Sequence, residues 1–161
     1  IAVLVFLVNF NSFAKRNDFI NFRKYALNHH KKKDTINAYK WVRDNTKTRD
    51  VFYTSSVFHG IYIVSAAGRK VLLVERNFSN PYVDWEKRNK DSMRLGNYIE
   101  KGQSGQLHKL MKKYSINYII TENAKQVASL NFKLRGSFKK EFNSGKLYIY
   151  ALKMQTTNNI K

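Results

Sequence analysis

Residues 51–75 read VFYTSSVFHGIYIVSAAGRKVLLVE, and this stretch decides the fold. Val51–Thr54 and Lys70–Glu75 are short apolar runs of the kind that form buried strands. Between them, Val57–Ala67 is apolar and long enough for a helix, which Gly68 is expected to end. A strand, a helix and a second strand in succession predict two parallel strands joined by a helical crossover.

The flanking sequence continues this alternation of strands and helices. Asp34 is placed to cap a helix that ends near Asn45, and Ser104 is expected to start an amphipathic helix. The other predicted elements are a helix from about Trp85 to Ile99, a strand at Ile116–Thr121, a short helix at Ala124–Leu130, and strands at Phe138–Phe142 and Lys146–Leu152 joined by Asn143–Gly145. We therefore predict an α/β fold, with a mostly parallel sheet of about three strands and a C-terminal antiparallel hairpin.

Four segments are predicted along the chain. Residues 1–14 open with IAVLVFLV and are expected to be the end of a transmembrane helix, because a complete one needs about 20 apolar residues; a buried core element is the alternative. Residues 15–33 are basic and carry aromatics at helical spacing, which favours a juxtamembrane helix against lipid headgroups or a connecting surface helix. Residues 34–153 form the soluble domain, and residues 154–161 form a polar tail.

Charge is the most distinctive feature of the composition. The chain of 161 residues has 30 Lys and Arg against 11 Asp and Glu, a net charge of +19. Such a surface attracts phosphate groups in lipids, lipid-linked sugars or nucleic acids, although a solvated surface without a partner is the alternative. Cysteine is absent, which excludes disulfides and Cys-ligated zinc or iron–sulfur centres.

Familiar catalytic and nucleotide-binding motifs are missing from the sequence, including the P-loop, the dinucleotide-binding glycine pattern, the zinc-protease helix and the nucleophile elbow. We therefore predict no catalytic residue, cofactor or metal site in this chain, and His59 is expected to be structural. Ligands of open parallel sheets bind beyond the carboxyl ends of the strands, where polar residues at 54–56, 75–77 and 121–123 are expected to meet. The candidate binding residues at or above this rim are Arg69, Arg76, Asn80, Tyr82 and Asp84. The arginines suit phosphate or carboxylate and the others suit sugar hydroxyls and stacking, while an ion pair with Arg88 is the alternative role for Asp84.

Several motifs resemble a known family. Ala38–Thr46 (AYKWVRDNT) followed by Asp50–Phe52 (DVF) is similar to the entry into the soluble C-terminal domain of bacterial polytopic membrane glycosyltransferases of the GT-C type. Ala67–Val71 (AGRKV) and Lys113–Ile120 (KYSINYII) resemble later steps of the same domain, and Asn80–Asp84 (NPYVD) resembles a segment of related uncharacterised membrane proteins.

The resemblance implies an accessory domain of a membrane glycosyltransferase, with the catalytic acidic residue in an early loop outside this chain. Its donor would be a polyprenyl-phosphate-linked sugar. Its partners would be lipid headgroups, a glycan acceptor or that donor, and the rest of the polytopic chain. Its place would be the bacterial cell membrane, with the domain on the extracytoplasmic side, whereas Lys15 and Arg16 favour the cytoplasmic side. A basic nucleic-acid-binding module and a small free-standing α/β enzyme are the alternatives.

Overall fold

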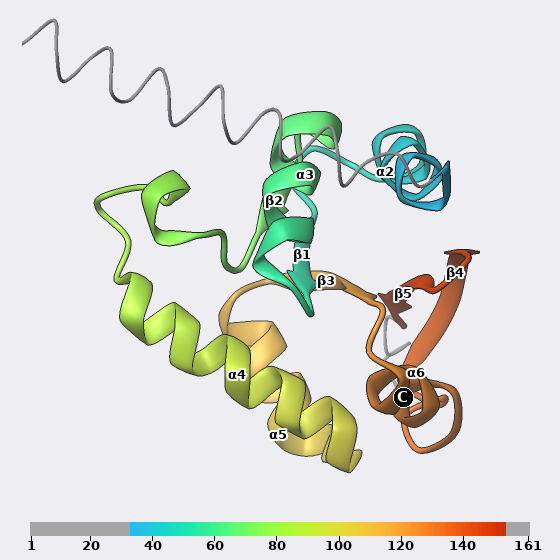
Figure 1. Cartoon of the computed structure of the whole chain (residues 1–161). Helices are drawn as coiled ribbons and strands as arrows, with labels where there is room; N and C mark the ends of the chain where they lie inside the picture. The colour runs from blue at the N-terminus through green and yellow to red at the C-terminus, as the bar shows by residue number, and fades with distance from the viewer. Residues whose placement is uncertain (1–32, 154–161) are drawn as a thin grey trace, which may run out of the picture.

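A central sheet lies between two layers of helices (Figure 1). The computed structural model describes residues 33–153. The segments predicted for residues 1–14 and 154–161, and nearly all of the segment 15–33, lie outside the described residues. Figure 1 shows α2 and α3 together on one side of the sheet and α4 and α5 on the other.

Helices and strands alternate through most of the described chain. The elements are α2 (Lys33–Asn45), β1 (Val51–Thr54), α3 (Val57–Ala67), β2 (Lys70–Val71), the short 3-10 helix η1 (Arg76–Phe78), α4 (Trp85–Lys101), α5 (Ser104–Lys113), β3 (Ile116–Thr121), α6 (Ala124–Phe132), β4 (Phe138–Ser144) and β5 (Leu147–Leu152).

The five strands form one mixed sheet in the order β2-β1-β3-β5-β4. β1 is parallel to both β2 and β3, and β5 is antiparallel to β3 and β4. The predicted α/β class, with three parallel strands and a C-terminal hairpin, is therefore confirmed. Strand order reverses at β1, because the chain goes from β1 to one neighbour and then crosses to the other.

Each sheet face has its own hydrophobic core. Phe52 packs with α2 and α3, while the next residue, Tyr53, packs with the cluster under α4, α5 and α6. Ile119 and Ile120 in β3 divide between the two clusters in the same way. Successive side chains of a strand point to opposite faces, so continuous apolar runs are what a sheet covered on both sides requires.

The predicted strand at Lys70–Glu75 is wrong beyond Val71, where β2 ends. One further backbone bond follows, from Leu72 N to Phe52 O at 2.9 Å. Leu72 and Leu73 are consecutive, yet both are buried in the same cluster. A regular strand would place them on opposite faces, so the chain leaves the edge of the sheet to bury both.

Two local predictions around the hairpin also need correction. Asp34 does not cap α2, because this helix already includes Lys33, and the Asp34 carboxylate instead accepts a hydrogen bond from Ser144 Oγ at 2.8 Å. β4 runs on through Ser144, so the turn begins at Gly145, whose φ is 55°. The Asp34 side chain lies so close that a Cβ on Gly145 would collide with it. The start of α2 is thereby tied to the hairpin.

Candidate functional site

The carboxyl ends of β1 and β3 lie side by side, as predicted. Ser55 N donates to Ile120 O at 3.0 Å just beyond β1. The polar side chains here serve the adjacent helices: Ser56 Oγ accepts from Phe58 N, and Asn123 Oδ1 accepts from Lys125 N and Gln126 N. The third predicted part of this rim, residues 75–77, does not end a strand, because β2 stops earlier and η1 occupies that position.

A buried histidine lies behind this rim. His59 Nδ1 is 2.7 Å from Tyr39 Oη, and its Nε2 is 3.5 Å from Glu122 Oε1. Burial lowers the pKa of His59, and the Glu122 carboxylate opposes this shift. Burial also raises the pKa of the Tyr39 hydroxyl, which therefore stays protonated. A neutral imidazole thus links α2, α3 and the end of β3, which agrees with the structural role expected for His59.

A pocket of about 570 Å³ opens at the β2 edge of the sheet, and we call it the edge pocket. Its walls are mainly apolar, and the charged residues that line it are all basic. One wall comes from α3, one from β2 and the residues after it, and one from η1, the following turn and α4. Its lining residues are Ile61, Val64, Ser65, Arg69–Leu72, Val74, Phe78–Asn80, Val83 and Arg88.

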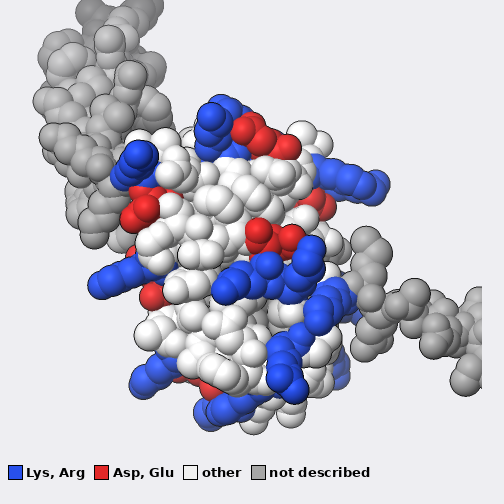
Figure 2. Space-filling model, turned by 90° about the vertical axis from the view of Figure 1, so that its right-hand side faces the viewer, with Lys and Arg blue, Asp and Glu red and all other residues white. Residues whose placement is uncertain are grey.

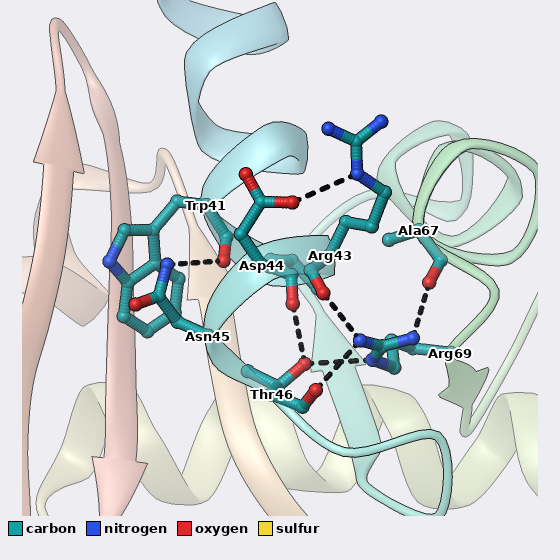
Figure 3. A network of polar contacts seen from close by, with 8 residues as sticks. Trp41, Arg43, Asp44, Asn45, Thr46, Ala67 and Arg69 are labelled. Carbon is teal, nitrogen blue, oxygen red and sulfur yellow. Dashed lines mark hydrogen bonds and ion pairs between the residues drawn. The ribbon is translucent and has the colours of Figure 1, made fainter.

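Arg69, the first predicted binding residue, lines this pocket but uses its guanidinium inside the protein (Figure 3). Its Nη2 donates to Arg43 O at 2.6 Å and to Thr46 O at 2.7 Å. Its Nε donates to Thr46 Oγ1 at 2.9 Å, and its Nη1 donates to Ala67 O at 2.6 Å. The residue is 9% exposed. A cation here satisfies carbonyls at the C-terminal ends of both α2 and α3, where the helix dipoles favour positive charge.

Of the other predicted residues, only Asn80 lines the edge pocket. Its Oδ1 accepts from Tyr82 N at 2.9 Å, which shapes the turn before α4. Tyr82 is 95% exposed. Asp84 caps α4 by accepting from Lys87 N at 3.0 Å. The alternative role for Asp84, an ion pair with Arg88, is not what the structure has.

Arg76 stands outside the pocket, next to α4. Its Nη1 is 3.4 Å from Glu86 Oε1, and its guanidinium carbon is 6.0 Å from the centre of the Trp85 ring. Trp85 Nε1 in turn donates to Val74 O at 2.8 Å, which fixes the indole against the pocket wall. The prediction therefore brought together two pocket residues, Arg69 and Asn80, and three that lie on the adjoining loop and helix start.

Sequence reasoning missed Phe78 and Arg88 as pocket residues. Phe78 is 43% exposed, and Arg88 reaches the pocket from the first turns of α4. Its guanidinium also lies 5.8 Å from the centre of the Tyr114 ring. The helical register after Asp84 was the available signal for Arg88, since it places residues 85 and 88 on one face.

A second polar cluster joins α4 to the end of α5. Asp91 is buried, and its carboxylate accepts from Lys113 Nζ and Tyr114 Oη, each at 2.7 Å, and from Arg94 Nη1 at 3.2 Å. The hydrogen bonds from Lys113 and Tyr114 hold the pKa of Asp91 below its usual value. Lys113 Nζ also lies 4.9 Å from the centre of the Tyr114 ring. This cluster connects the two helices on the same sheet face.

The positive charge of the sequence is displayed on the surface. In the face shown by Figure 2, basic side chains outnumber acidic ones and several form a run across its middle. Some are paired, as Lys139 is with Glu141 at 3.1 Å. Such a surface favours anionic partners in general.

Two further searches concern residues 33–153 alone. Within that range no group of three or more His, Asp or Glu side chains is close enough to hold a metal ion. In the same range, none of the helices is both long enough and apolar enough to cross a bilayer.

Comparison with known proteins gives one informative relation. No protein-family model matches the sequence, and no curated protein matches it. Among solved structures, the chain is similar to the C-terminal globular domain of oligosaccharyltransferase from Archaeoglobus fulgidus, with a TM-score of 0.50 and 14% sequence identity. The match covers 73% of this chain and 95% of that domain. At this identity the likeness is one of fold alone, and this chain has the coarse fold of an oligosaccharyltransferase C-terminal domain.

Proposed function

We propose that this chain is an accessory domain of a membrane glycosyltransferase that uses a polyprenyl-phosphate-linked sugar. The observation that carries the proposal is the fold, because the likeness spans 95% of an oligosaccharyltransferase C-terminal domain. The sequence motifs that resemble GT-C glycosyltransferases support it independently of the fold. The domain stabilises the enzyme or positions the acceptor or the lipid-linked donor at the extracytoplasmic membrane face, and the catalytic residues belong to another part of the enzyme.

The edge pocket is the proposed contact site for that donor or acceptor. Apolar walls with basic residues and an amide at the rim suit a ligand that carries both an apolar or sugar face and a phosphate. Arg76, Tyr82 and Asp84 stand on the loop and helix start that form one side of the pocket. Tyr82, which is 95% exposed, is the side chain most available for stacking on a sugar ring.

The test replaces Arg76 and Tyr82 by alanine in the full-length protein and measures glycan transfer. The side chain of Arg76 is 72% exposed, and Tyr82 is exposed almost completely, so neither change is expected to unfold the domain. We expect the double variant to transfer less glycan in cells, measured by mass spectrometry of envelope glycans, at an unchanged protein level. Phe132→Ala is the matched control, because Phe132 is 76% exposed and lies on α6. Unchanged transfer in the double variant would reject these contact residues.

A further inference from the structure

The outward face of α3 is uncharged. None of the 11 residues of Val57–Ala67 is Asp, Glu, Lys or Arg, although a quarter of the whole chain is charged. Phe58 is 41% exposed and Val64 is 47% exposed, and Ser65 and Ala66 beside them are also exposed. A helix on the surface of a soluble domain normally turns a charged or polar face to water. This surface therefore differs from those of the other helices of the domain.

The apolar surface continues across the edge pocket. Val64 and Phe78 both line this pocket, from α3 and η1 respectively, and Phe78 is 43% exposed. Val83 lies on the same lining, so apolar side chains from three separate segments meet here. We call the exposed residues Phe58, Val64 and Phe78, together with the pocket between the last two, the α3 face. Contiguous exposed apolar surface of this kind marks an interaction site.

Basic groups surround the α3 face. The charged residues that line the pocket are Arg69, Lys70 and Arg88, and Asp and Glu are absent from its lining. Arg69 is committed to carbonyl groups, whereas Lys70 is exposed. Arg76 and the exposed ring of Tyr82 stand on the adjoining loop. Apolar side chains within a border of cations and an amphipathic aromatic ring have the arrangement of a surface that lies in the headgroup region of a bilayer.

We infer that the α3 face rests on a membrane that contains anionic lipid. Val64, Phe58 and Phe78 enter the boundary between headgroups and acyl chains, and Lys70, Arg76 and Arg88 lie against the lipid phosphates. Charge complementarity favours this occupant over a second copy of the chain, because two such faces would bring like charges together. The edge pocket then opens toward the lipid. The inference concerns a surface, and it stands whether or not the domain acts in glycan transfer.

The absence of cysteine makes this contact directly measurable, because a single introduced thiol can be labelled in the full chain. Val64→Cys and Phe78→Cys are labelled with an environment-sensitive fluorophore, and Phe132→Cys and Met93→Cys are the controls. Phe132 and Met93 are 76% and 66% exposed and lie on α6 and α4. On addition of vesicles of phosphatidylcholine and phosphatidylglycerol, we expect a blue shift and brighter emission at positions 64 and 78 only.

The basic border is tested on the same labelled protein. Replacing Lys70 or Arg76 by alanine is expected to raise the vesicle concentration for half-maximal response at position 64 by roughly fivefold each. Lys109→Ala on α5 is the matched control and is expected to leave that concentration unchanged.

Three results would overturn the inference. Positions 64 and 78 would respond to vesicles no more than positions 132 and 93. Positions 64 and 78 would already emit as in an apolar environment before vesicles are added, which would mean that another part of the chain or a second copy covers the face. The response would be the same on vesicles of phosphatidylcholine alone, which would remove the role of the anionic headgroup. Since glycan transfer is not measured, these results are independent of the test in the preceding subsection.

Discussion

Arg69 and Thr46 are 23 residues apart in the sequence and are joined by two hydrogen bonds. Arg69 Nε donates to Thr46 Oγ1 at 2.9 Å, and Arg69 Nη2 donates to Thr46 O at 2.7 Å. The same guanidinium also binds a carbonyl at the end of α3 (Figure 3). One side chain therefore holds together the C-terminal ends of both helices on this face of the sheet.

Arg69→Ala is expected to lower the free energy of unfolding by about 2–4 kcal/mol, because it leaves several carbonyl groups without a charged donor. Arg69→Lys is expected to recover only part of this loss, since one ammonium cannot reach acceptors on both helices. Urea denaturation of the three proteins measures the difference. Arg76→Ala, at an exposed ion pair, is the control and is expected to change stability by less than about 0.5 kcal/mol. An equal effect at both arginines would contradict the structural role of Arg69.

The buried carboxylate of Asp91 predicts a change in acid stability. Its pKa is lowered in the folded protein by hydrogen bonds from Lys113 and Tyr114. The unfolded chain therefore takes up this proton first, so the stabilisation is present above about pH 3.9 and is lost as the pH falls through the lowered pKa. We expect Asp91→Asn to reduce stability by about 1–3 kcal/mol at neutral pH.

Urea midpoints between neutral and strongly acidic pH measure this effect. Asp91→Asn should lose less stability than the wild type below about pH 3.9, because the titrating group is absent. Asp44→Asn, in an exposed pair with Arg43, is the matched control and should follow the wild type. Parallel acid profiles for wild type and Asp91→Asn would show that Asp91 does not supply this pH dependence.

His59 predicts a second pH effect in a separate range. Burial lowers its pKa in the folded state, so the unfolded chain binds the proton more readily. Stability is therefore full above about pH 6.5 and falls as the pH drops toward the lowered pKa, by at most about 1.4 kcal/mol per pH unit. His59→Gln is expected to flatten the stability profile between neutral pH and about pH 5. His108→Gln is the matched control, and a profile unchanged by His59→Gln would refute the assignment.

Gly60 and Gly105 are both helical, but only Gly60 lies against backbone. A Cβ on Gly60 would stand 2.6 Å from Leu73 O, whereas a Cβ on Gly105 would meet nothing within 4 Å. Gly60→Ala should therefore cost about 1–3 kcal/mol through overpacking. Gly105→Ala should leave stability unchanged or raise it by up to about 1 kcal/mol, because alanine favours the helix. Thermal unfolding of both variants decides this, and equal melting temperatures would be inconsistent with close packing of α3 on Leu73.

Part of the candidate site was predictable from local sequence. Thr54 and Thr121 end apolar runs, so their position at one edge of a parallel sheet follows from the fold class. Asn80 comes before the single proline of the chain, which marked the turn at the pocket. Arg69 was identified as a residue of interest, but its role depends on carbonyl groups of α2 that are distant in the sequence. The contribution of Phe78 depends on how η1 folds against α3, which no local pattern encodes.

The sequence by itself determined the elements whose signals are local. Val51–Thr54, Val57–Ala67 and Ile116–Thr121 have the predicted bounds, because alternate burial on a sheet and helix termination at Gly68 depend on residues only a few positions apart. Tertiary structure alone decided that β2 ends at Val71, that Asp34 binds the hairpin, and that Arg69 joins two helix ends. Each of these outcomes depends on a contact between residues far apart in the chain, and such contacts form only once the sheet has brought its helices together.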